Sequence, residues 1–141
     1  MSEPVLPPPP PGARVIDTGW VRFWRGDDGI VYDHTYISGR IEAEAMCRGV
    51  EAIRELTGGR PAPLLAWADK MGSPTREARE VFSGDEAARV ISAMAVVVGS
   101  PVVRLVMTFA VRVAPPAYPV ALFSTVEDAQ AWCSGFLELS G

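Results

Sequence analysis

The sequence predicts an α/β domain: a mixed sheet of about five strands, opened by an antiparallel hairpin, with helices packed on it. Two observations predict this class. After two opening strand patterns, short apolar runs alternate with helical patterns, which is typical of parallel strands joined by crossover helices. The chain also has 141 residues, of which 48% are hydrophobic, enough for the core of one domain. We therefore expect a single domain over residues 13–141.

The segment before this domain is rich in proline. Five consecutive prolines, Pro7–Pro11, precede Gly12 and favour an extended polyproline II conformation. We expect residues 1–12 to form a disordered tail that adds nothing to the core. The tail has neither the basic nor the apolar region of a signal peptide, so we expect a cytoplasmic location.

Two strand patterns open the domain, Arg14–Trp24 and Ile30–Tyr36, and the turn-forming sequence RGDDG separates them. Three aromatic side chains of the first pattern, Trp20, Phe23 and Trp24, cannot all face one side of a single strand. At least one of them is left for another surface. The edge of the hairpin is therefore the expected place for a homodimer contact.

The middle of the chain alternates helix and strand patterns. A helix is predicted over Ser38–Thr57, where apolar residues recur on one side, and a buried strand over Pro63–Asp69. Ser73 is the expected N-cap of the next helix, with Pro74 at its first position and its end near Phe82. A capping box of Ser83 and Glu86 is expected to begin another helix.

The most apolar stretch, Val90–Val113, is too short and too interrupted for a membrane span, which needs about 20 apolar residues. Pro101 would break a continuous helix, but it fits a helix that begins there with Ser100 as the N-cap. We expect a strand over Ser92–Val98 and a helix over Pro101–Val113, both in the interior of the domain.

The C-terminal part predicts a last βα unit. Val120–Phe123 is a short apolar strand pattern after the proline-rich sequence APPAYP. A final helix follows, and Ser124 and Glu127 are expected to form its capping box.

Composition and motifs argue against several classes of function. The net charge is −4 and the 13 basic residues are scattered, so we expect no nucleic-acid partner. His34 is the only histidine and has no spacing typical of metal ligands, while Cys47 and Cys133 fit reduced, buried thiols. The nucleotide-binding and hydrolase motifs with fixed glycine spacing are missing from the sequence. We expect a protein that is not an enzyme and needs no metal or cofactor.

Three segments carry a resemblance to a known family: TREAR (Thr75–Arg79), GSPVVR (Gly99–Arg104) and LFSTVEDAQAW (Leu122–Trp132). With the predicted order of elements, they resemble the SpoIIAA-like branch of the STAS superfamily, small α/β proteins related to anti-sigma-factor antagonists and to the lipid-binding CRAL-TRIO fold. The resemblance covers residues 13–137. It implies a phosphorylatable serine at the start of the helix after the third strand, a position that corresponds to Ser73 with Asp69 upstream.

Two functions follow as hypotheses. The first is a regulatory or protein-interaction module that resembles STAS domains, meets a protein partner around Asp69, Ser73 and Thr75, and is controlled by phosphorylation near Ser73. The alternative is a carrier of a small apolar ligand or lipid. Its pocket would be lined by hairpin aromatics and by residues of the late helix. The candidate pocket residues are Trp20, Phe23, Val102, Val106 and Phe109.

Overall fold

The computed structural model describes residues 6–68 and 72–140. Its main sheet has six strands in the order β1-β2-β3-β5-β7-β8. The pairs β1–β2 and β2–β3 are antiparallel, and the pairs β3–β5, β5–β7 and β7–β8 are parallel. Their bounds are β1 (Val15–Asp17), β2 (Val21–Arg25), β3 (Val31–Thr35), β5 (Ala62–Ala68), β7 (Ile91–Val97) and β8 (Val120–Phe123). The predicted mixed sheet, opened by an antiparallel hairpin, is confirmed.

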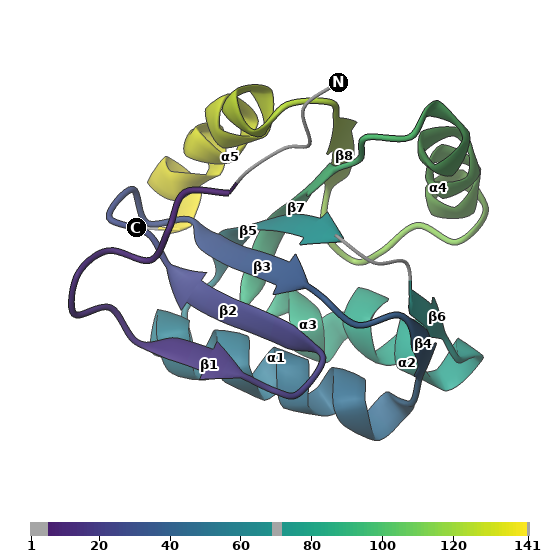
Figure 1. Ribbon diagram of the computed structural model, residues 1–141, viewed down its shortest axis with the longest axis horizontal. Coiled ribbons are helices and arrows are strands. Elements are labelled where there is room, and N and C mark those ends of the chain that lie inside the picture. The colour runs from purple at the N-terminus through teal and green to yellow at the C-terminus, as the bar shows by residue number, and fades with distance from the viewer. Residues whose placement is uncertain (1–5, 69–71, 141) are drawn as a thin grey trace.

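Helices cover both faces of this sheet (Figure 1). One face packs against α1 (Ala43–Thr57), α2 (Arg76–Ser83) and the short α3 (Asp85–Ala88), and the other packs against α5 (Val126–Ser140). The helix α4 (Pro101–Val113) lies beside β8 at one end of the sheet. A small second sheet pairs β4 (Gly39–Ile41) in parallel with β6 (Gly72–Pro74).

Alternation along the strands divides the core into two clusters. Phe23 and Val31 point into the cluster on the α1 side, whereas their neighbours Trp24 and Tyr32 point into the cluster on the α5 side. All four are less than 7% exposed. A buried side chain of this size stabilises the fold by about 1.5–3 kcal/mol, so both faces hold the sheet in place.

The hairpin differs from the prediction in its first strand. Residues 14–24 form two strands, because the chain turns back at Gly19, which has a φ of +98° that favours glycine. Thr18 N–H donates to the Val21 carbonyl at 3.0 Å, and Gly19 N–H donates to the Asp17 carboxylate at 2.9 Å. These bonds close a tight turn between β1 and β2, which gives the sheet one strand more than the five expected.

The first helix begins later than predicted, at Ala43 rather than Ser38. Gly39–Ile41 pairs with Gly72–Pro74, and this pairing draws both segments into extended conformation. For the same reason Ser73 is not a helix cap. Thr75 is the N-cap of α2, and its hydroxyl oxygen accepts a hydrogen bond from Ala78 N–H at 3.1 Å.

Two more predicted caps are displaced by one residue. Gly84 is the N-cap of α3, while the Ser83 hydroxyl donates to the Arg79 carbonyl at 2.7 Å. At the start of α5, the Thr125 hydroxyl accepts from Asp128 N–H at 3.2 Å, so Thr125 takes the place expected for Ser124.

The cap of α4 agrees with the prediction. The Ser100 hydroxyl accepts from Val103 N–H at 3.3 Å, and Pro101 is the first residue of the helix. The strand before it, Ile91–Val97, lies within one residue of the predicted one. The expectation that α4 itself is interior is wrong, since none of its residues is buried.

The proline-rich segment contributes to the core, contrary to expectation. Leu6 is 7% exposed and belongs to the α5-side cluster, together with Trp24 and Tyr32. Leu6 therefore reaches the core, whereas Pro8, Pro9, Pro11 and Gly12 are exposed. Of the two thiols expected to be buried, Cys133 is buried and Cys47 is exposed.

Candidate functional site

The residues predicted to meet a protein partner lie near the small second sheet. Ser73 is an exposed residue of β6, and its partner in register on β4 is Arg40. Thr75 is half-buried and its hydroxyl group caps α2. Asp69 lies outside the described residues. Ser73 is therefore open to solvent, without the capping role assigned to it from the sequence.

The residues predicted to line an apolar pocket lie in two separate places. Phe23 is 1% exposed and Trp20 packs against the same α1-side cluster. Val102, Val106 and Phe109 are all on α4, beside β8, which is at the opposite end of the sheet from β1. The structure does not bring the two groups together.

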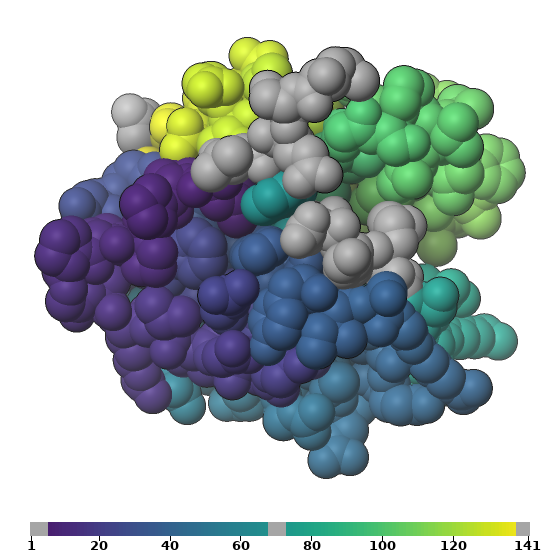
Figure 2. Space-filling view, in the orientation of Figure 1, coloured from purple at the N-terminus to yellow at the C-terminus, as the bar shows by residue number. Residues whose placement is uncertain are grey.

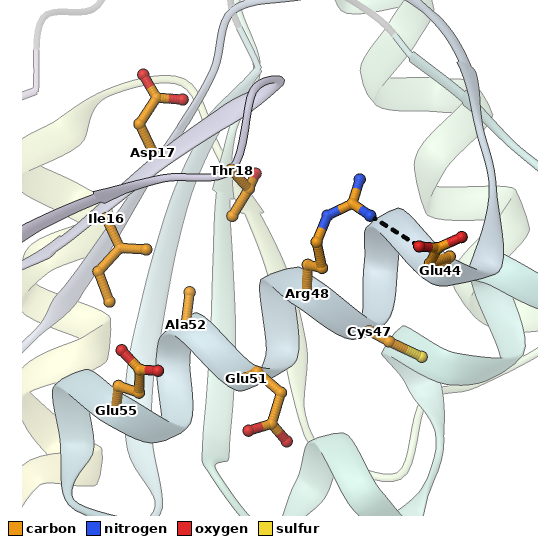
Figure 3. A pocket seen from close by; sticks show the side chains of 9 residues that line it. All are labelled: Ile16, Asp17, Thr18, Glu44, Cys47, Arg48, Glu51, Ala52 and Glu55. Atoms are coloured by element: carbon orange, nitrogen blue, oxygen red, sulfur yellow. Dashed lines mark hydrogen bonds and ion pairs between the residues drawn. The ribbon is translucent and has the colours of Figure 1, made fainter.

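A shallow pocket of about 430 Å³ lies elsewhere, between β1 and α1 (Figure 3). Acidic side chains of α1 surround it, and Arg48 forms an ion pair with Glu44 at 3.3 Å. The pKa of Asp17 in this pocket is lowered, chiefly by the hydrogen bond from the Tyr36 hydroxyl. The lining residues are Ile16, Asp17, Thr18, Glu44, Cys47, Arg48, Glu51, Ala52 and Glu55. The pocket thus offers an open, acidic rim to the solvent.

One carboxyl group is deeply buried. Asp33 on β3 is 5% exposed and lies between its register partners Phe23 and Ala66. Burial raises the pKa of Asp33 to about 7, although the hydroxyl group of Thr35, which donates to it at 3.1 Å, opposes the shift. Its neighbour His34 points to the other face of the sheet, where its ring stacks on Trp67 with centroids 5.0 Å apart. The two groups therefore cannot act as an acid–base pair.

Within residues 6–68 and 72–140, no three histidine, cysteine or acidic side chains gather as a metal site would require. In the same ranges, no helix has the length and apolarity needed to cross a membrane.

The most unusual surface of the molecule is the outer side of α4, which we call the α4 face. It consists of five large apolar residues that are between 60% and 72% exposed. These residues are Val102, Leu105, Val106, Phe109 and Val113. Figure 2 shows α4 as a separate ridge, with a notch between it and the part of the surface formed by α2 and β6. Soluble proteins seldom expose so many large apolar side chains together unless another molecule covers them.

Arg104 joins α4 to the end of the sheet. The guanidinium group of Arg104 donates to the Ser124 hydroxyl at 2.7 Å and to the Leu122 carbonyl at 3.4 Å. The carbonyls of Pro119 and Phe123 accept hydrogen bonds from the N–H groups of Met94 and Val98. Because carbonyls alternate in direction along a strand, the Leu122 carbonyl points away from β7, to the open edge of the sheet. The hydrogen bonds of Arg104 thus attach α4 to this edge.

Sequence reasoning found Val102, Val106 and Phe109 but assigned them to an internal pocket. The polar residues of the same helix do not reveal which apolar side is exposed. Arg104, Thr108 and Arg112 recur every four residues and form one polar stripe. In the structure Arg104 and Arg112 are exposed, and the half-buried side of α4 is formed by Val103, Met107, Thr108 and Val111. Apolar residues therefore lie on both sides of α4, and the sequence does not show which of them the protein covers.

The fold places the chain in a known structural class. An uncharacterised protein of the DUF3478 family from Shewanella loihica PV-4, described as having a SpoIIAA-like fold, superposes with a TM-score of 0.51 at 14% sequence identity. The match covers 94% of this chain and 98% of that one. The architecture is therefore SpoIIAA-like, in agreement with the resemblance drawn from the sequence.

The sequence itself identifies a narrower group. Residues 23–137 match the family described as domain of unknown function (DUF7793), and the chain belongs to this family. No curated protein matches the chain.

Proposed function

We propose that this protein is a non-enzymatic interaction module that binds a protein partner through the α4 face. The observation that carries the proposal is the exposure of its five apolar residues, each 60–72% accessible. A hydrophobic surface that is rimmed by polar groups and held by a rigid element is typical of protein–protein interfaces. The α4 helix meets this description, because Arg104 attaches it to the edge of the sheet and the apolar residues lie beside the exposed Arg112.

Regulation by phosphorylation at Ser73 is part of this proposal, by resemblance to STAS domains. Its support is that Ser73 is exposed and lies next to Arg40 in the paired strand. The guanidinium group of Arg40 forms an exposed ion pair with Glu42 at 2.7 Å, and a phosphoryl group can compete for it. The test is phosphosite mapping on protein from cells, with binding of the partner to Ser73→Asp. An unmodified Ser73, together with unchanged binding by Ser73→Asp, would remove regulation and leave the docking surface as proposed.

A carrier of a small apolar ligand is the second candidate, favoured by the same exposed side chains of α4. The two candidates differ in what co-purifies with the protein. Native mass spectrometry that finds a stoichiometric apolar ligand, lost in Phe109→Glu, would favour the carrier. A protein of the bare chain mass would favour the interaction module.

The proposed docking surface is tested by site-specific photocrosslinking in cells. A photoreactive amino acid at position 109 should give an adduct of discrete mass, whereas the same group at position 15 should not. Val15 is a suitable control because it is 43% exposed and lies on β1, at the other end of the sheet. The partner protein identified in this adduct, once purified by itself, should bind the wild-type chain and not the Phe109→Glu variant. The absence of a discrete adduct at position 109 would refute the proposal.

A further inference from the structure

The exposed residues on α4 have the spacing that is typical of a contact between two packed helices. Val102, Val106, Phe109 and Val113 follow one another at intervals of four, three and four residues. Alternating intervals of three and four are the positions at which one helix packs along another. The stripe is about 16 Å long at 1.5 Å per residue, so it matches three turns of a partner helix.

This spacing is also symmetric, which favours one particular partner helix. Read in the reverse direction, the intervals are again four, three and four. In an antiparallel pair of two α4 helices, Val102 therefore faces Val113 of the second copy, and Val106 faces Phe109. Every exposed residue of the stripe meets an exposed apolar residue, as a two-fold axis requires.

Charge favours the antiparallel arrangement over the parallel one. The α4 helix contains no acidic residue, and Arg104 is bound to its own chain. A parallel pair would place Arg112 beside Arg112 of the second copy and would align the two helix dipoles. In an antiparallel pair the two Arg112 side chains lie at opposite ends of the contact. The two helix dipoles then point in opposite directions, which is favourable.

The area is sufficient for a specific contact. The four side chains of the stripe and Leu105 beside it, at about two-thirds exposure, present on the order of 500 Å². A two-fold contact buries this area on both copies, on the order of 1,000 Å² in total, where specific interfaces begin.

We infer that the α4 face pairs with the α4 face of a second copy of this chain, as antiparallel helices about a two-fold axis. The inference rests on the proposed function, since it names the partner of the same surface. It also moves the dimer contact away from the hairpin, where Phe23 and Trp24 are in the core and do not contribute to an outer surface.

Sedimentation velocity on the full chain tests the self-association. The wild type should sediment at twice the monomer mass at about 50 µM, while Phe109→Glu should sediment as a monomer. The exposure of position 109 allows this variant to fold, which circular dichroism and urea unfolding will verify. Val15→Glu, the matched control, should stay dimeric. A wild type that is monomeric up to 200 µM, or a folded Phe109→Glu that remains dimeric, would overturn the inference.

Disulfide trapping tests the orientation. In a Cys47→Ser background, Val102→Cys and Val113→Cys proteins are mixed and oxidised mildly. Antiparallel pairing predicts at least a tenfold excess of the mixed disulfide over either like pair. A predominance of like pairs, or no trapping beyond that of a Val15→Cys control, would overturn the arrangement.

The outcomes also separate this inference from the proposed function. If the wild type is monomeric but position 109 still crosslinks to a different protein, pairing with a second copy is refuted and the docking surface stands. If the wild type binds vesicles of phosphatidylcholine and phosphatidylglycerol and Phe109→Glu does not, with no protein adduct at position 109, both proposals fail.

Discussion

Replacement of Asp33 by asparagine should change how the stability of the fold depends on pH. Burial raises the pKa of this carboxyl group from 3.8 to about 7. Between these two values the folded state retains a proton that the unfolded state has released. The contribution of the neutral carboxyl group to stability is therefore complete below pH 3.8 and is lost as the pH rises through 7. Asparagine has no such proton, and its side-chain oxygen can still accept the hydrogen bond from Thr35.

The size of the effect follows from the pKa difference. Each unit corresponds to about 1.4 kcal/mol, so the free energy of unfolding of the wild type should fall by about 4 kcal/mol relative to Asp33→Asn between pH 4 and pH 8. Urea unfolding followed by tryptophan fluorescence across this range measures the difference, since the chain has four tryptophans.

A matched control is Asp17→Asn. Asp17 is exposed and its pKa is lowered, so its contribution to stability is lost only as the pH falls below about 4. This variant should leave the slope between pH 5 and pH 8 unchanged. If the curves of the wild type and Asp33→Asn run parallel over the whole range, Asp33 does not hold a proton in the folded state, and the reasoning from burial is wrong.

Other predictions concern caps, the proline-rich segment and α4. Thr75→Ala should lower the free energy of unfolding by about 1 kcal/mol, because it removes the N-cap of α2, whereas Ser73→Ala should change it by less than about 0.5 kcal/mol; urea unfolding measures both. Leu6→Ala should cost about 2 kcal/mol in the same assay, and an equal stability of Leu6→Ala and Pro8→Ala would show that Leu6 does not pack in the core. Arg104→Ala should increase amide hydrogen exchange in residues 101–113 several-fold while the midpoint of global unfolding stays constant; unchanged exchange would mean that the bonds to the sheet edge do not hold α4.

Local signals predicted the parts of the fold in which local and tertiary preferences agree. The strand near Ser92–Val98 and the helix at Pro101 were predictable because a buried apolar run, a capping serine and a proline at the first helical position all favour the same structure. The displaced cap near Ser73 shows the opposite case. Serine and threonine are both good caps, and a strand pairing with Gly39–Ile41 decides between them.

The sequence pointed to three residues of the candidate site, Val102, Val106 and Phe109, but it did not predict that they are exposed to solvent. Val102 and Phe109 are apolar, so their burial is favourable. The sequence does not show whether the protein's own core or another molecule buries them. Their position depends on the bonds from Arg104 to residues about 20 positions later in the chain. Such a contact leaves no periodic signal, so sequence reasoning placed the helix in the interior.

The contact between Arg104 and Leu122 also bears on solubility at high concentration. An open strand edge is a template for the addition of further strands, and this process leads to fibres. The edge strand β1 has only three residues. At the other edge, in β8, the outward carbonyl of Leu122 already accepts a hydrogen bond from the guanidinium group of Arg104. Growth of the sheet from either side is therefore disfavoured. A pair of α4 helices about a two-fold axis is complete after two copies, whereas a free β8 edge would admit chain after chain.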